Sequence, residues 1–472
     1  MLTLPALEKE TLTGWGMRNA AVCRVARPQT VDGLHALVAH ARQEGMTIGL
    51  RGGGNSYGDA AINAGQVVIE SSGLNQILEW NAETGQITVE PGVTIAQIWR
   101  KTLPDGWWPA VVPGTSMVTA AGAAAANIHG KNNWHAGAFG DYVVSFDLLL
   151  ASGETVRCSR DEHEDLFYAA IGSMGLLGIF TRLTLQARRI YSGNVREVQT
   201  THGSLADLIA ALEAASDIST DLVAWIDTGA RNGELGRGLL RAGNDLREGE
   251  DSEPERSMSV RAQEHQSALM RMLPADLIPM LARPMTTPLG VWAANRAQWI
   301  RGQNERSSQP RLESYAAANF LLDAIPNWRK TYLPGGLIQH QSFIPRNTAP
   351  QAFREILERS HTAGIVPSLS VLKKHRPADE FLLSYLLDGY SLALDYPVRR
   401  GEEERVMRLM RTLYDVVVDY GGKLYFAKDS TATPDQAQRM LGTERINRFH
   451  ELKRQYDPEG LFSSDLYRRV LA

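Results

Sequence analysis

Three consecutive glycines within a run of small polar residues constrain this chain more than any other feature. The run reads Arg51, Gly52, Gly53, Gly54, Asn55, Ser56, Tyr57, Gly58 and Asp59. Because glycine costs roughly 1 kcal/mol relative to alanine in the interior of a helix, the run predicts a loop. The backbone N–H groups of such a loop can converge on an anion with no side chains in the way. Taken alone, the run predicts either a surface turn or an anion-binding loop.

Length and composition predict a globular protein of two domains. A chain of 472 residues exceeds one ordinary core, and its 43% hydrophobic and 22% charged residues are typical of globular proteins. The net charge of −4 disfavours a nucleic-acid partner. Cys23 and Cys158 form neither a disulfide framework nor a metal-ligand spacing, so we expect no metal site.

The chain shows no targeting or membrane-spanning pattern. Residues 1–20 lack a basic stretch followed by an apolar one, so we expect no signal peptide. No window approaches 18 apolar residues without a charge, which disfavours a spanning helix. We therefore expect a cytoplasmic protein that contacts the inner membrane only peripherally, if at all.

The predicted elements indicate an α+β fold. Strands are expected at 66–69, 86–90, 143–150 and 178–185, and Thr94 is expected to cap a helix that begins at Ile95. No strand near the N-terminus is followed by G-x-G-x-x-G, so a Rossmann fold is disfavoured. From about residue 188 the glycine-rich loops thin out and longer elements appear.

One segment of the second half has an unusual composition. Residues 267–299 are rich in Met, Leu, Pro and Trp. This composition fits a lid or a patch that contacts a membrane, and it also fits ordinary core packing of short helices.

A second small-residue segment points to a large ligand. Thr119 and seven small residues precede Asn127, and His129-Gly130-Lys131-Asn132 follows almost directly. An alanine-rich helix explains residues 120–126 but not the basic turn after it. Small side chains let the backbone approach a flat ligand. Together with the glycine run, this segment predicts a cofactor that carries a pyrophosphate.

These segments resemble, in order, the flavin-binding domain of the vanillyl-alcohol oxidase (PCMH-type) superfamily, and within it the decaprenylphosphoryl-β-D-ribose 2′-oxidase family. The resemblance extends from residue 12 almost to the C-terminus. It rests on Leu12–Gly16, Arg51–Asp59, Ile128–Asn132 with Gly137–Gly140, Ala224–Asp227, Gln339–Gln341, Leu424–Ser430, and Asp457-Pro458 with Ser464–Leu466.

The resemblance implies a two-domain PCMH-type fold that binds FAD. It implies an FAD-binding domain at 1–187, a mixed-sheet substrate domain at 188–415, and a segment at 416–472 that returns to the FAD domain. Residues 51–59 would hold the pyrophosphate and ribose. Gly114, Thr119, Ala121, Gly122, Ala126, Asn127 and His129 would line the flavin, with Ile179 near the adenine and Tyr425 reaching the cofactor from the last segment.

Asn55 implies a non-covalent cofactor. Several relatives carry, in the corresponding loop, a histidine that bonds to the flavin, whereas asparagine has no comparable nucleophilic nitrogen. Neither Cys23 nor Cys158 lies where a second covalent link would be expected. We therefore expect FAD without a covalent bond to the protein.

Lys428 is the leading catalytic candidate. By resemblance it lies beside the flavin and substrate, where an ammonium stabilises negative charge or holds the substrate hydroxyl. If burial lowers its pKa, Lys428 could instead take the hydroxyl proton. Without the resemblance, a solvated strand-end lysine is the favoured interpretation of Lys428. His129 is a second candidate, either as a base or as a histidine held by hydrogen bonds near the cofactor.

Gln339 and Gln341 alternate along 337–343, so both face one side of a strand while His340 faces the other. Paired amides suit sugar hydroxyls, because an amide both donates and accepts, although surface-facing glutamines fit the same pattern. Lys131 and Lys373 are candidates for a substrate phosphate, and Trp225 completes the predicted substrate-binding set.

Two departures from the family pattern suggest a reshaped pocket. Ala393 stands in the strand that precedes Asp395-Tyr396-Pro397, where relatives often carry a cysteine. The turn Asn133-Trp134-His135 also differs from the usual histidine-rich form. Both changes leave the lipid part of the substrate open.

The resemblance implies FAD-dependent oxidation of a secondary alcohol of a sugar. Its substrate would be a polyprenyl-phosphate-linked pentose oxidised at the 2-position, and an NAD(P)H-dependent reductase would complete an epimerisation. A free polyol or aldonolactone oxidase and a non-catalytic flavin-fold binding protein are the alternatives, and the oligomeric state is open.

Overall fold

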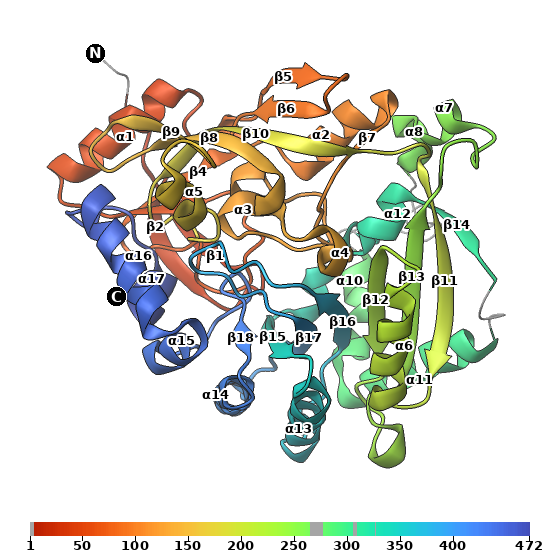
Figure 1. Ribbon diagram of the computed structural model, residues 1–472. Coiled ribbons are helices and arrows are strands. Elements are labelled where there is room, and N and C mark those ends of the chain that lie inside the picture. Colours follow the sequence, from red (N-terminus) through yellow and green to blue (C-terminus); the bar gives the residue numbers. More distant parts are fainter. Residues whose placement is uncertain (1–3, 265–276, 305–308, 326) are drawn as a thin grey trace.

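The computed structural model describes residues 4–264, 277–304, 309–325 and 327–472. Within them, helices and strands alternate in a mixed arrangement, which confirms the α+β prediction. The strands form three sheets, two in the first part of the chain and one large sheet in the second (Figure 1).

The first sheet positions the glycine run. Its strand order is β1-β2-β4-β3, and its strands are β1 (Glu8–Thr13), β2 (Ala20–Ala26), β4 (Val67–Glu70) and β3 (Ile48–Arg51). Helix α1 (Val31–Gln43) connects β2 to β3 and begins at Thr30, whose side chain accepts from Gly33 N at 3.1 Å. Because β3 ends at Arg51, the glycine run leaves the carboxyl end of a strand in the parallel part of the sheet.

The second sheet is antiparallel and supports the small-residue segment. Its strands are β5 (Ile77–Asn81), β6 (Gln86–Val89), β10 (Ile179–Arg189), β8 (Val143–Leu149) and β9 (Thr155–Ser159), with β7 (Trp107–Pro109) paired to β10. Thr94 caps α2 (Ile95–Thr102) through a capping box with Gln97, which confirms the predicted start of this helix. Beside this sheet lie α3 (Ala120–Ala125) and α5 (Glu164–Ala170), whereas the short helix α4 (Asn133–Ala136) contacts the third sheet.

The third sheet lies in the second part of the chain. Its order is β14 (Arg311–Ser314), β11 (Asn194–His202), β13 (Gly238–Asp245), β12 (Asp221–Ile226), β16 (Leu369–His375), β17 (Gly389–Pro397), β15 (Leu337–Pro345) and β18 (Lys423–Leu424). Helices α6 (Leu205–Ser216), α13 (Ala349–Thr362) and α14 (Glu403–Asp419) pack on one face (Figure 1). The other face of β15–β17 is therefore left to meet the first half of the chain.

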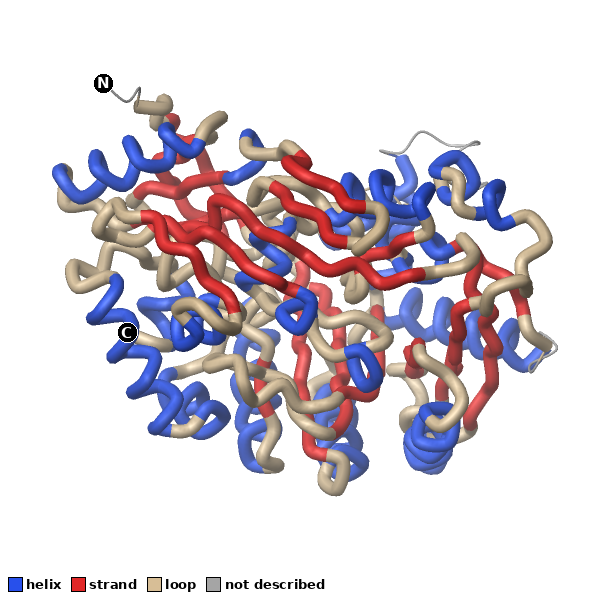
Figure 2. Tube along the Cα trace, turned by 45° about the horizontal axis from the view of Figure 1, so that its top comes forward, coloured by secondary structure: helices blue, strands red, loops and turns tan. Residues whose placement is uncertain are grey.

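The C-terminal segment packs against the first sheet. It contains α15 (Pro434–Leu441), α16 (Thr443–Tyr456) and α17 (Asp465–Val470), which Figure 2 shows against the half of the molecule that carries the first two sheets. Ile48 N donates to Leu461 O at 2.7 Å, and Ser463 N donates to Ile48 O at 2.9 Å. The domain boundaries predicted after residues 187 and 415 stay predictions. Residue 187 lies within β10, and residue 415 lies within α14.

Short helices carry the unusual segment at 267–299. Residues 267–276 lie outside the described part of the chain. The rest forms α10 (Leu277–Ala282), a 3₁₀ turn and α11 (Pro288–Asn304), preceded by α7 (Pro254–Ser257) and α8 (Val260–Gln263) and followed by α12 (Tyr315–Asn319). Val291 and Trp299 are buried, as core packing requires, whereas Leu281 and Leu289 are 65% and 74% exposed. In the described ranges, every helix is too short or too polar to cross a bilayer.

Candidate active site

A cavity of about 330 Å³ lies between the glycine run, α3 and the open face of β15–β17. The predicted cofactor residues that line it come from four segments distant in sequence. They are Arg51, Gly52, Gly53, Gly54, Asn55, Ser56, Tyr57, Gly114, Thr119, Ala121, Gly122, Ala126, His129, Ile179 and Tyr425. The structure therefore brings most of the predicted cofactor set to one wall.

The glycine run packs so closely on the segment before α3 that side chains do not fit there. A Cβ at Gly52 would lie 2.3 Å from Thr119 Oγ1, and one at Gly53 would lie 2.6 Å from Met117 O. Gly54 has φ +66°, in the region that favours glycine. Thr119 itself caps α3 by accepting from Gly122 N at 3.2 Å. Of the two predictions for the glycine run, the surface turn is therefore excluded, because the run forms part of the cavity wall.

Several buried polar atoms on this wall lack protein partners. Asn55 donates through Nδ2 to Met117 O at 3.2 Å, while its Oδ1 is buried without a hydrogen bond. The hydroxyl of Tyr57 and Nδ1 of His129 are likewise buried and unpaired among the described residues. Buried polar groups are seldom left unsatisfied, so these atoms fit a wall that completes its hydrogen bonds with a polar cofactor.

Three residues predicted to bind the cofactor lie behind this wall. Asp59 accepts from Arg469 at 2.7 and 2.9 Å, and a Cβ at Gly58 would lie 1.7 Å from Asp429 O. Asn127 adopts φ +42° and accepts from Gly140 N at 2.8 Å. These contacts anchor the glycine run and the turn after α3, so Gly58, Asp59 and Asn127 support the wall without lining it.

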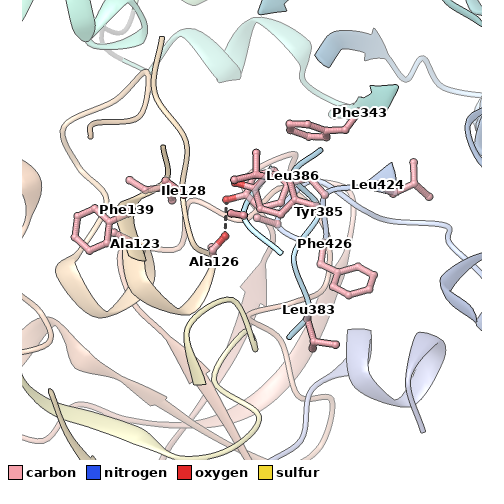
Figure 3. Close-up of a cluster of buried hydrophobic side chains, with 14 of the residues drawn as sticks. Ala123, Ala126, Ile128, Phe139, Phe343, Leu383, Tyr385, Leu386, Leu424 and Phe426 are labelled. Carbon is pink, nitrogen blue, oxygen red and sulfur yellow. Dashed lines mark hydrogen bonds between the residues drawn. The ribbon is translucent and has the colours of Figure 1, made fainter. Parts of the chain in front are cut away.

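Tyr425 joins α3 to the end of the third sheet. Its hydroxyl donates to Ala126 O at 3.1 Å, and Tyr385 donates to Asn127 O at 2.7 Å. The two tyrosine rings lie 4.0 Å apart. Figure 3 shows Tyr385 between Ala126 and Phe343. The junction holds the two halves of the cavity together.

Lys428 lies at the cavity against Tyr57, with Nζ 3.9 Å from the centroid of the tyrosine ring. Burial lowers the pKa of Lys428 to about 7, although the charge of Asp395 opposes the change. Burial also raises the pKa of Asp395 to about 6, against the hydrogen bond from Gln339 and the charge of Lys428. Lys428 is thus a partly buried lysine at the cavity, within electrostatic reach of the buried Asp395, and not a freely solvated one.

Gln339 and Gln341 both face the cavity, and His340 faces α14, as the alternation predicts. Gln339 donates to Asp395 Oδ1 at 2.5 Å, and Gln341 hydrogen-bonds His129 Nε2 at 2.9 Å. The surface-facing alternative is wrong, because the two glutamines are only 9% and 5% exposed. His340 is fully buried near Tyr414, and burial lowers its pKa to about 3.

His129 is held in place by its hydrogen bond with Gln341. Because a glutamine N–H can only donate, Nε2 of His129 accepts the hydrogen bond from Gln341. Burial, and then the charge of Lys373, lowers the pKa of His129 well below its usual value. The geometry therefore favours His129 as a neutral histidine fixed near the cofactor over His129 as a base.

The remaining predicted substrate residues differ in whether they line the cavity. Lys373 lines the cavity, and burial lowers its pKa to about 8. Lys131 lines it too, but its ammonium is held by the carbonyl of Ala318 and lies 3.8 Å from Glu197. Trp225 does not line the cavity, whereas Val223 on the same strand does.

Sequence reasoning did not select Ser391 or Asp395. In β17, Ser391, Ala393 and Asp395 lie on one face, and Gln341 is opposite Ala393. The alternation was visible in the sequence, but the pairing of β15 with β17 was not. Ala393 does line the cavity, at the position where relatives often carry a thiol.

Comparison with known proteins agrees with this geometry. The FAD binding domain family matches residues 23–159, and the D-arabinono-1,4-lactone oxidase family matches residues 340–470. Decaprenylphosphoryl-β-D-ribose oxidase of Mycolicibacterium smegmatis is 31% identical over 469 residues, covering 97% of each chain. The chain belongs to this oxidase family.

Other relatives match only about a third of the chain. L-gulonolactone oxidase of Bos taurus is 31% identical over 34% of this chain and 36% of its own. D-arabinono-1,4-lactone oxidase of Yarrowia lipolytica is 30% identical over 35% of this chain and 32% of its own. Membership of the oxidase family makes the protein an FAD-dependent oxidoreductase that acts on CH–OH groups.

Proposed function

We propose that this enzyme oxidises the 2-hydroxyl of a polyprenyl-phosphate-linked pentose to a ketone. The observation that carries the proposal is the similarity to decaprenylphosphoryl-β-D-ribose oxidase over 97% of both chains. The similarity to the lactone oxidases above covers only about a third of the chain. An NAD(P)H-dependent reductase acting on the resulting ketone would complete an epimerisation.

In this proposal the cavity wall built on the glycine run holds FAD without a covalent bond. When bound, FAD supplies the acceptor for a hydride from the carbinol carbon. Asn55 supports the non-covalent state, since its amide donates to Met117 O and offers no nucleophile. Gly114, Gly122 and Ala126 keep the wall shallow where a flat ring system would lie.

Lys428 takes the proton of the reacting hydroxyl. With a pKa of about 7, a substantial fraction of this amine is neutral at physiological pH, as a general base requires. Asp395, behind Gln339, balances the ammonium that forms. The chain thus provides a proton acceptor and its counter-charge at one end of the cavity.

The third sheet orients the sugar. One N–H of Gln339 and one of Gln341 are committed to Asp395 and His129, which leaves the amide oxygens to accept from sugar hydroxyls. Lys373 is the better phosphate candidate: both lysines line the cavity, but the ammonium of Lys131 is held by Ala318 O.

An exposed apolar surface supports contact with a membrane-borne lipid. We define it by the large apolar side chains of α10 and its neighbours, which are 44–74% exposed: Leu277, Met280, Leu281, Met285, Leu289 and Trp292. Leu321 is 46% exposed and also lines the cavity, so a lipid chain could pass from the cavity to an apolar environment.

The test is anaerobic reduction of the bound flavin. A polyprenyl-phosphoribose should bleach the flavin absorbance, whereas xylitol and gulonolactone should not. Bleaching by gulonolactone or xylitol, with none by the lipid-linked sugar, would instead support a lactone or polyol oxidase, which the match at residues 340–470 favours as a second candidate.

A further inference from the structure

Three buried polar side chains form a line that ends at the cavity wall. Ser391 on β17 and His375 on β16 are each 1% exposed, and Asn133 is fully buried. His375 Nε2 lies 2.7 Å from Ser391 Oγ, and His375 Nδ1 lies 2.7 Å from Asn133 Oδ1. Of the three, only Ser391 lines the cavity.

Asn133 determines which atom donates and which accepts in each hydrogen bond of this line. An amide oxygen only accepts, so Nδ1 of His375 carries the proton that Asn133 Oδ1 receives. Burial, and then the charge of Lys373, lowers the pKa of His375 well below its usual value, so the ring carries a single proton. Nε2 is therefore the acceptor, and Ser391 donates its hydroxyl proton to it.

The hydroxyl oxygen of Ser391 can therefore only accept a hydrogen bond from a group in the cavity. A free serine both donates and accepts, but this one has its proton committed to His375. Lys373 is opposite Ser391 in the β16–β17 register and also lines the cavity. The other strand neighbour of Ser391 is Phe343, which has no hydrogen-bonding group on its side chain. This end of the cavity therefore offers one fixed acceptor beside one cation.

Ser391 lies far along β17 from Asp395, the carboxyl that accompanies the proposed proton acceptor. Ser391 and Asp395 are four residues apart on one face of β17, which corresponds to about 13 Å along the strand. Asp395 accompanies Lys428, whereas the ring of His375 lies 4.9 Å from that of His129. On this spacing we assign Ser391 to a part of the substrate other than the hydroxyl that Lys428 deprotonates.

We propose that Ser391, polarised by His375 and Asn133, is a substrate-binding residue that accepts a hydrogen bond from a second hydroxyl of the sugar. The inference rests on the proposed function and adds a specificity rule to it. A hydroxyl satisfies this acceptor, whereas hydrogen, fluorine or an ether oxygen at the same position leaves it unpaired. An unpaired buried acceptor is costly, so the site discriminates by rejection as well as by attraction.

The test compares a short-chain polyprenyl-phosphoribose with analogues that are deoxy or deoxyfluoro at each hydroxyl other than C2. Their affinities are measured by the perturbation of the flavin spectrum and by calorimetry in Ser391→Ala, wild type and the control Ser342→Ala. Ser342 is a buried serine of β15 that does not line the cavity.

At one of these hydroxyl positions, the deoxy and the deoxyfluoro analogue should both bind wild type about 3- to 10-fold more weakly than the parent sugar. The variant Ser391→Ala should lose this discrimination and weaken binding of the parent by a similar factor. The control Ser342→Ala should keep the discrimination.

Two results would overturn the inference. Equal affinity of wild type for the parent and all analogues would remove the acceptor from recognition. Full affinity of a fluoro analogue whose deoxy partner binds weakly would mean that Ser391 donates. Failure of the proposed function is distinguishable, because the parent sugar would then not bleach the flavin of wild type or of Ser342→Ala.

Discussion

Replacing Lys428 by methionine should abolish flavin reduction and make the folded protein more stable. The pKa of Lys428 is about 7 in the folded protein against a usual value of 10.5. Between these values the unfolded chain holds a proton that the folded protein lacks, so the stability of wild type rises with pH. Methionine has a similar length and no charge to desolvate. The stability that the variant gains over wild type is therefore greatest below pH 7.

The magnitude follows from the same two values. At 1.36 kcal/mol per pKa unit, keeping this amine neutral in the fold at pH 8 costs roughly 3 kcal/mol. Methionine also loses the attraction between Lys428 and Asp395, so we expect a net gain of about 1–2 kcal/mol at pH 8. The gain should fall towards zero as the pH approaches 10.5, where the unfolded chain also releases its proton.

The assay is thermal unfolding of the FAD-saturated enzyme from pH 6.5 to 10, followed by flavin fluorescence, for wild type, Lys428→Met and Lys101→Met. Lys101 is an exposed lysine of α2 and provides the matched control. The difference in Tm between Lys428→Met and wild type should shrink as the pH rises, and anaerobic substrate should leave the flavin of this variant oxidised. A difference that stays constant with pH, or a variant less stable than wild type at pH 7, would refute the reasoning.

Three further outcomes are expected. Acid precipitation should release all FAD into the supernatant, and flavin retained on the denatured chain would contradict the role given to Asn55. Gly58→Ala should lower FAD occupancy, because its Cβ would lie 1.7 Å from Asp429 O, while Gly233→Ala, with open space around the Cβ, should not. Arg469→Met should destabilise the protein by about 3 kcal/mol in chemical denaturation, since Asp59 and Asp429 lose their shared counter-ion; an unchanged midpoint would show that the pairing is dispensable.

Local features of the fold could be read from the sequence, because short-range physics decides them. The capping box at Thr94 depends on residues three positions apart, and it lies where it was expected. The alternation of Gln339, His340 and Gln341 follows from the period of a strand, and it correctly separated the cavity face from the α14 face. The glycine run predicted a loop for the same kind of reason.

The assembly of the site could not be read in this way. His129 contacts Gln341 across 212 positions, and Asp59 contacts Arg469 across 410. Strand periodicity says which residues share a face but not which strands pair, so the position of Asp395 beside Gln339 was not predictable. The same limit explains why Asn127 and Trp225 were predicted for the site but do not line the cavity, and why the ammonium of Lys131 is held by Ala318 O.

The sequence by itself determined a glycine-rich loop, an α+β fold and, through the order of its motifs, a flavin-dependent oxidase. Only the tertiary structure decided which polar groups meet at the cavity and in which protonation state. The physical reason is that pKa values and hydrogen-bond direction depend on burial and on distant neighbours. Lys428 titrates near neutral pH because the third sheet buries it beside Asp395, and Ser391 becomes an acceptor because His375 and Asn133 lie behind it.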